Sequence, residues 1–285
     1  MSLSTTERWY EDWQSRAHAD TFDFRSRLGD QNLIRSYESL NDVRILNERF
    51  GRSTSLSLLE VGCATAEFYR YLRLKYPRIQ YYGVDISRPA IEIARRKYPA
   101  AKLSLADAGR HPVNYLEISG LADAAGIVYA KDVAHHQTKP LDFVANLIGI
   151  SKVALVMRCR TRDIGPTEND PELSCQYHYG GWMPYIITNL DELVRHIQEM
   201  APRSEIVVYR NHMILGGKQG RFLPKDCYLE ETGTAETAVG VFLKTDSPAK
   251  VTIQNRSDQN PSYTFVHHLR LAAQRVGRMM RSRER

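Results

Sequence analysis

Residues 58–68 read Leu58-Leu59-Glu60-Val61-Gly62-Cys63-Ala64-Thr65-Ala66-Glu67-Phe68, an apolar run that ends at a carboxylate and turns into a loop of small residues. This pattern predicts a buried parallel strand that leads into a helix. Gly62 stands where the backbone must turn sharply and let a ligand approach closely. We therefore expect a nucleotide-type binding site at this turn.

A second strand is predicted a short distance downstream. The intervening helix, from about Glu67 to Tyr76, has apolar residues at helical spacing and stops before Pro77. The strand over 79–85 then ends in Asp85, and a carboxylate at this place suits the two hydroxyls of a ribose. Strand, turn, helix, strand and acid make one βαβ unit with a right-handed crossover.

These residues carry a resemblance to a known family. The run from Glu60 to Ala66, followed by Gly83-Val84-Asp85-Ile86-Ser87, resembles the first two motifs of the class I S-adenosylmethionine-dependent methyltransferases. The similarity continues through Ala106-Asp107-Ala108 and the run from Val128 to His136, and it covers roughly residues 55–162. A nicotinamide dehydrogenase is the competing interpretation, but its fingerprint needs glycines at 64 and 67 that this chain lacks.

The resemblance implies an α/β fold. We expect a doubly wound, seven-stranded and mostly parallel sheet with an antiparallel edge strand over 237–244, the Rossmann-like methyltransferase fold. Three parts are expected along the chain: an N-terminal helical cap over 1–50, a cofactor-binding domain over 51–246, and a basic linker with an amphipathic tail over 247–285. Lid insertions are expected near 159–188 and 211–235.

The resemblance also implies a cofactor, S-adenosylmethionine, and the residues that hold it. Glu60 and the loop at Gly62, Cys63 and Ala64 would bind the methionine part. The remaining expected contacts are Asp85 and Ile86 at the ribose, Asp107 and Ala108 at the adenine, Lys131, and Tyr10, whose aromatic face could stabilise the sulfonium. The family usually has glycine where this chain has Ala64 and Ala66, and we expect a negative φ at both.

Catalytic side chains are expected just beyond the fourth strand, over 124–130. Lys131, Asp132, His135 and His136 follow this strand, at the sheet edge where open α/β folds bind ligands. Transfer to an oxygen atom needs a base near neutral pH, which histidine supplies. We therefore expect His135 or His136 to act as the base, with His178 in reserve, and Asp132 to orient it or to line the pocket.

Three functions remain open from the sequence. The first is methylation of a small molecule, at an oxygen of a sugar or a secondary metabolite, which the histidine pair and an aromatic lid favour. The second is methylation of RNA or protein, which only the basic tail favours. The third is a cofactor-binding module without catalysis, which the alanines of the loop allow.

Composition limits the partners of the chain. All of the net charge of +6 comes from residues 247–285, where eight Lys or Arg face two acids. The balanced remainder argues against a nucleic-acid groove, while the tail could contact an anionic membrane or a partner protein. No apolar run is long enough to span a membrane, so we expect a cytoplasmic protein. The four cysteines are widely spaced, and no metal site is expected.

Overall fold

The structure is a computed structural model that describes residues 25, 27–53, 55–107, 126–178, 181–216, 220–229, 232–243 and 248–255. Tyr10, Ala108 and the basic tail beyond residue 255 lie outside this set, so the roles expected for them stay predictions. Among the described residues, no helix combines the length and the apolar character needed to cross a membrane.

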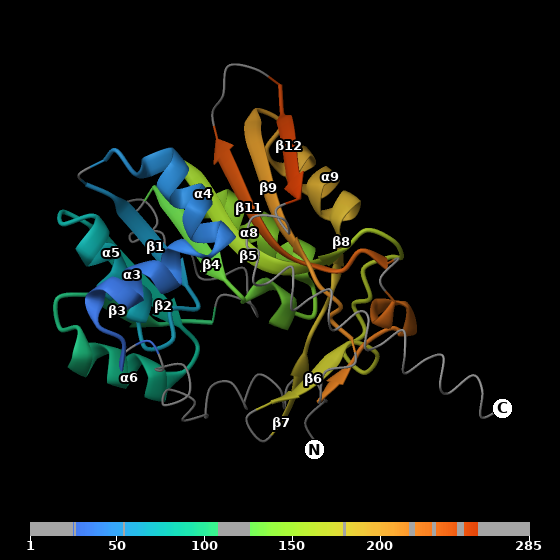
Figure 1. Cartoon of the computed structure of the whole chain (residues 1–285), viewed down its shortest axis with the longest axis horizontal. Coiled ribbons are helices and arrows are strands. Elements are labelled where there is room, and N and C mark those ends of the chain that lie inside the picture. Colours follow the sequence, from blue (N-terminus) through green and yellow to red (C-terminus); the bar gives the residue numbers. More distant parts are fainter. Residues whose placement is uncertain are drawn as a thin grey trace.

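One large sheet forms the centre of the molecule (Figure 1). Its long strands are β1 (Ser57–Val61), β2 (Gln80–Asp85), β3 (Lys102–Leu105), β4 (Ile127–Lys131), β5 (Ala154–Arg162), β9 (Ser204–His212), β11 (Ala235–Leu243) and β12 (Lys250–Asn255). They lie in the order β12-β9-β11-β5-β4-β1-β2-β3, and the short β8 (Thr188–Asn189) pairs with β5. Only β11 runs against the others among these described strands, so the expected mostly parallel α/β sheet is confirmed.

The structure corrects two details of the expected sheet: it has nine strands among the described residues, where seven were expected, and its antiparallel strand has a different place. The antiparallel strand β11 does not form the edge, because β9 pairs with its far side and β12 pairs parallel to β9. Residues 250–255, which we expected to begin a polar linker, therefore belong to the sheet. The three consecutive β-branched residues Val251, Thr252 and Ile253 favour a strand despite the polar residues that follow them.

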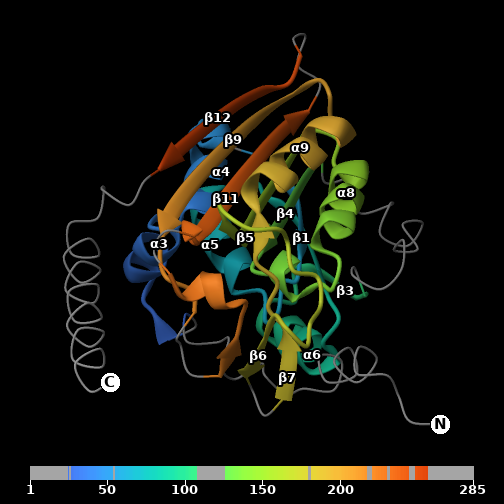
Figure 2. The same ribbon diagram turned by 90° about the vertical axis from the view of Figure 1, so that its right-hand side faces the viewer.

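Helices cover both faces of the sheet (Figure 2). On one face lie α3 (Asp30–Glu38), α4 (Asn41–Phe50), α5 (Glu67–Lys75) and α6 (Arg88–Lys97). On the other face lie α8 (Pro140–Ile150) and α9 (Leu190–Met200). The N-terminal helices expected before residue 50 are confirmed for the described part, where α4 contacts β5, β9 and β11.

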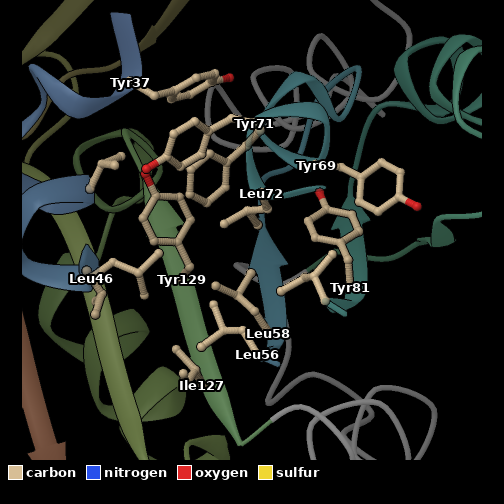
Figure 3. Close-up of a cluster of buried hydrophobic side chains, with 14 of the residues drawn as sticks. Tyr37, Leu46, Leu56, Leu58, Tyr69, Tyr71, Leu72, Tyr81, Ile127 and Tyr129 are labelled. Atoms are coloured by element: carbon tan, nitrogen blue, oxygen red, sulfur yellow. The ribbon is translucent and has the colours of Figure 1, made fainter. Parts of the chain in front are cut away.

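An aromatic core connects the first helices to the sheet. Figure 3 shows Tyr37, Tyr71 and Tyr129 gathered between α3, α5 and β4. The ring of Phe68 stacks on that of Tyr129 with the centroids 4.4 Å apart, and it lies 5.2 Å from the ring of Tyr37. Such pairs add about 0.5–1.5 kcal/mol beyond the burial of their surface. Because Tyr37 and Phe68 also line the cavity described below, this packing fixes one of its walls.

Both expected lid segments contribute to a second, smaller sheet. It consists of β6 (Cys175–His178), β7 (Gly181–Pro184) and β10 (Arg221–Phe222) in the antiparallel order β10-β6-β7, and the short helix η3 (Lys225–Tyr228) follows it. Figures 1 and 2 show this small sheet at one end of the molecule, apart from the large sheet. Segments near 175 and 221 are thus held together by backbone hydrogen bonds.

Candidate active site

A cavity of about 450 Å³ lies at the carboxyl ends of β1, β2 and β4. This volume falls within the range of roughly 300–1,000 Å³ that is typical of small-molecule sites. Its position agrees with the rule that open parallel sheets bind ligands beyond the carboxyl ends of their strands. The walls include Arg25, Tyr37, Glu60, Gly62, Cys63, Ala64, Thr65, Phe68, Asp85, Ile86, Ser87, Asp107, Lys131, Asp132, His136, Gln137 and Arg158.

Three acids at or near the carboxyl ends of successive strands line this cavity together. Glu60 lies in β1, Asp85 ends β2 and Asp107 follows β3. The carboxylate of Asp85 is fixed by two backbone groups: Ala64 N donates to Oδ2 over 2.7 Å, and Ser87 N donates to Oδ1 over 2.8 Å. The sequence order of the acids is therefore preserved along one edge of the sheet, as expected.

The loop after β1 departs from expectation in its backbone. Ala64 has a φ of 46° and Ala66 a φ of 59°, so both occupy the left-handed region and the expected negative φ is wrong. The reason is visible at both positions. The turn aims the N–H of Ala64 at Asp85, and the N–H of Ala66 donates to Cys63 O over 2.8 Å. The alanines thus keep the conformation that glycine adopts at no steric cost, at about 1–2 kcal/mol each.

Gly62 is required by its surroundings. It has a φ of +78°, and a Cβ atom added there would lie 2.3 Å from Cγ2 of Val133. Any other residue would displace Val133, which also lines the cavity. The prediction that the chain turns sharply at Gly62 is confirmed.

The electrostatics at the floor of the cavity favour a neutral Glu60. Burial raises the pKa of this carboxyl to about 8, although the hydroxyl of Tyr81 donates a hydrogen bond to it. Burial likewise raises the pKa of the neighbouring Cys63 thiol, which is therefore no nucleophile at neutral pH. Burial also lowers the pKa of Lys131.

Asp132 is held as an anion. Its φ of 60° is the third left-handed value among the described non-glycine residues, and its N–H donates to Arg158 O over 3.0 Å. Arg158 and Arg160 both contact the carboxylate. Burial works to raise the pKa of Asp132, but the two guanidinium groups outweigh it and hold the pKa well below its ordinary value. Asp132 is therefore a counter-ion rather than a proton acceptor.

The structure separates the two histidines of the short helix η2 (Ala134–His136). His136 lines the cavity, and its Nδ1 lies 2.9 Å from Pro184 O. A carbonyl oxygen can only accept, so Nδ1 carries the proton and Nε2 keeps a basic lone pair. His135 is only 3% exposed and is not part of the cavity wall. Its ring packs edge-on against Tyr185, with the centroids 4.9 Å apart.

Burial keeps both imidazoles neutral. Burial, with smaller effects of Arg160 and Arg221, lowers the pKa of His136 to about 4, although the hydrogen bond to Pro184 O and the charge of Asp132 act to raise it. Burial, helped by His136 and Arg160, lowers the pKa of His135 well below its ordinary value.

Sequence reasoning missed several residues of this cavity. Arg158 comes from the middle of β5, and Arg25 lies over the Tyr37 ring with its Cζ 4.8 Å from the ring centroid. Arg25 and Lys131 give the cavity a positive side that could hold the carboxylate of an amino acid. Spacing along the chain gives no signal for these arginines, because the partner of Arg158 lies 26 residues away, that of Arg25 lies 11 residues away, and neither spacing belongs to a local motif.

Most of the expected cofactor residues come together. Glu60, Gly62, Cys63, Ala64, Asp85, Ile86, Asp107 and Lys131 all line the cavity. The acids, the turn at Gly62 and the positive side offer groups for the hydroxyls, the amine and the carboxylate of S-adenosylmethionine. When bound, this cofactor supplies an activated methyl group. The residues present therefore fit it, and fold and cavity together define a Rossmann-like enzyme with a nucleoside-containing cofactor.

Comparison with known proteins agrees with this class. Residues 59–151 match the family described as a methyltransferase domain. No curated protein matches the chain. The matched segment, about a third of the chain, is therefore similar to a methyltransferase domain.

Solved structures that resemble the chain share its fold at low identity. The N-terminal domain of EvdMO1 with SAH bound is 12% identical, with a TM-score of 0.50 over 70% of this chain and 79% of that one. The [4+2]-cyclase SpnF is 12% identical, with a TM-score of 0.51 over 86% of this chain and 98% of that one. A putative sarcosine dimethylglycine methyltransferase from Galdieria sulphuraria is 10% identical, with a TM-score of 0.51 over 76% and 88%.

Proposed function

We propose that the chain transfers the methyl group of S-adenosylmethionine to an oxygen atom of a small molecule, with His136 as the general base. The observation that carries this proposal is the position of His136. It lies in the wall of the cavity beside Asp132, and its Nδ1–H is engaged by Pro184 O. Nε2 therefore has the lone pair that a base needs.

The roles of the other residues follow from their geometry. Glu60 and the Gly62 loop would hold the methionine part, Asp85 the ribose and Asp107 the adenine. Asp132, fixed by Arg158 and Arg160, would keep a negative charge close to His136. This charge stabilises the imidazolium that forms when His136 takes the acceptor's proton. Orientation of the acceptor and removal of its proton are then the chain's contributions to the rate.

Replacing His136 tests the proposed base. His136→Gln keeps an N–H donor for Pro184 O but has no basic nitrogen, so kcat should fall by roughly 10²–10⁴-fold. The assay follows labelled methyl from S-adenosylmethionine into a small-molecule extract. His196→Asn, in α9 outside the cavity, is the matched control and should keep the parent rate. A His136→Gln enzyme with unchanged kcat would remove the base assignment.

A further inference from the structure

The small sheet of β6, β7 and β10 is attached directly to the histidine side of the active site. Pro184 at the end of β7 accepts from His136 Nδ1, and Ile186 N donates to His135 O over 2.7 Å. Between them, Tyr185 is only 2% exposed, and its ring centroid lies 6.0 Å from that of His136. Side chains of this sheet that reach the Tyr185 ring therefore lie close to the proposed base.

Arg221 of β10 is one of these side chains. Its Cζ lies 4.3 Å from the centroid of the Tyr185 ring. Its Nε donates to Gln176 Oε1 over 3.1 Å, and its Nη1 donates to Leu215 O over 3.3 Å. All three partners are neutral groups. They fix the direction of the guanidinium without balancing its charge.

Among the described residues, the acids close to Arg221 pair with other arginines. Arg158 contacts Asp42, Asp132 and Glu236, and Arg160 contacts Asp132 and Glu236. Within the described part of the chain, no carboxylate interacts with Arg221. Burial lowers the pKa of Arg221, and the nearby Arg160 lowers it further, so the fold holds this cation at an electrostatic cost.

A guanidinium that is held in one direction, half-buried and without a counter-ion among the described residues suits a carboxylate or a phosphate. We infer that the methyl acceptor carries such an anionic group, and that Arg221 binds it while the acceptor's nucleophile faces His136. The inference rests on the proposed function and names the class of its substrate. The two distances to the Tyr185 ring keep Arg221 Cζ within about 10 Å of the His136 ring. A small acceptor with an acidic substituent spans that distance.

The first test is binding, which does not require the acceptor to be known. Benzoate, its neutral analogue benzamide and inorganic phosphate are titrated into the full chain saturated with S-adenosylhomocysteine. The parent should bind benzoate or phosphate at least roughly tenfold more tightly than benzamide. Arg221→Gln should lose this preference while it binds S-adenosylhomocysteine within about twofold of the parent. Arg203→Gln, an exposed change just before β9, is the control and should keep the preference.

Two results would overturn the inference. One is a parent that binds benzamide as tightly as both anions, a result that is independent of any variant. The other is an Arg221→Gln chain with the parent's preference. If Arg221→Gln does not fold, Arg221→Lys replaces it and should retain the preference in weaker form, because it keeps the charge but loses the planar fork.

The second test separates this inference from the proposed function. A small-molecule extract is divided by anion exchange, and each fraction is incubated with labelled S-adenosylmethionine and the enzyme. Label in the retained, anionic fraction supports the inference. Label only in the unretained fraction contradicts it but leaves the methyltransferase function intact. Label in no fraction contradicts the proposed function, and the binding test still decides the role of Arg221.

Discussion

Ala64 has a backbone conformation that its Cβ atom makes unfavourable. Its φ of 46° lies in the region that glycine occupies without cost, and its N–H is tied to Asp85. Two of the three described non-glycine residues with positive φ, Ala64 and Asp132, line the cavity, and Ala66 follows two positions after Ala64. Strain of this kind collects at functional sites, where the surrounding contacts hold it in place.

Replacing Ala64 with glycine should therefore stabilise the protein. We expect Ala64→Gly to raise the free energy of unfolding by about 0.5–1 kcal/mol, because relief of the left-handed strain exceeds the added chain entropy. The measurement is urea denaturation. Ala94→Gly is the control: Ala94 is buried inside α6, and this change should destabilise by about 1 kcal/mol or more. An Ala64→Gly protein that is less stable than the parent would contradict the inference that the backbone at Ala64 is strained.

Glu60 should make stability depend on pH in a characteristic direction. Its pKa is about 8 in the folded protein against an ordinary 4.5, so the folded state holds a proton that the unfolded state releases between these values. The stability from this group is fully present below pH 4.5 and is lost as the pH rises through 8, at no more than about 1.4 kcal/mol per pH unit.

Denaturation at several pH values checks this slope. Glu60→Gln should remove the part of the pH dependence of stability that Glu60 causes between pH 5 and 8. Glu92→Gln, an exposed change in α6, should leave the pH dependence of the parent unchanged. Equal slopes for Glu60→Gln and the parent would show that Glu60 is ionised in the folded state.

The lowered pKa of His136 leads us to expect an unusual pH profile for the proposed reaction. Because burial lowers its pKa to about 4, the imidazole is already neutral at pH 5 and above. We expect that the titration of His136 leaves kcat constant from about pH 5.5 to 8. As the pH drops through about 4, His136 becomes protonated and kcat should fall. A fall centred near the ordinary histidine pKa of about 6.5 would indicate an unshifted base.

At the scale of elements, an ion network ties the N-terminal helices to the sheet. Arg158 of β5 contacts Asp42 of α4, Asp132 after β4 and Glu236 of β11. The hydroxyl of Tyr129 in β4 also donates to Asp42. A buried cation with three acids couples four elements in one place and shapes the wall beside the proposed base.

Removing the cation of this network should be costly. Arg158→Met leaves the buried Asp42 and the partly buried Asp132 without this partner, and we expect a loss of about 3–5 kcal/mol in the free energy of unfolding. Arg44→Met removes a half-exposed arginine that pairs with Glu48 in α4, and it should cost at most about 0.5 kcal/mol. Thermal or urea denaturation measures both. Similar losses for the two variants would show that the network contributes little.

Elements built from local patterns could be predicted, and contacts between distant elements could not. The strand, turn and acid from Glu60 to Asp85 were predicted because hydrophobic periodicity and a required glycine act within a few residues. Asp42 and Arg158 were missed as partners because pairing across 116 positions leaves no local pattern. The position of Arg221 near the histidines could not be predicted either, because it depends on the pairing of β10 with β6.

The whole molecule places its chemistry at one edge of one sheet. Parallel strands bring Glu60, Asp85 and Asp132 together, and the two lid segments combine into the small sheet beside His136. The sequence could not predict this second sheet, because its strands are short and β10 pairs with residues of β6 about 45 positions earlier in the chain. Its attachment to the histidine pair supports the proposal that it helps to recognise an acceptor.

The central claim is that this cavity holds S-adenosylmethionine through the acids at the strand ends. Calorimetric titration with S-adenosylhomocysteine tests it most directly, with the parent, Asp85→Ala and the exposed control Asp142→Ala of α8. We predict micromolar binding by the parent and the control, and binding at least about tenfold weaker by Asp85→Ala, which loses the ribose contact and the support of Ala64. No binding by the parent, or equal binding by Asp85→Ala, would contradict the account.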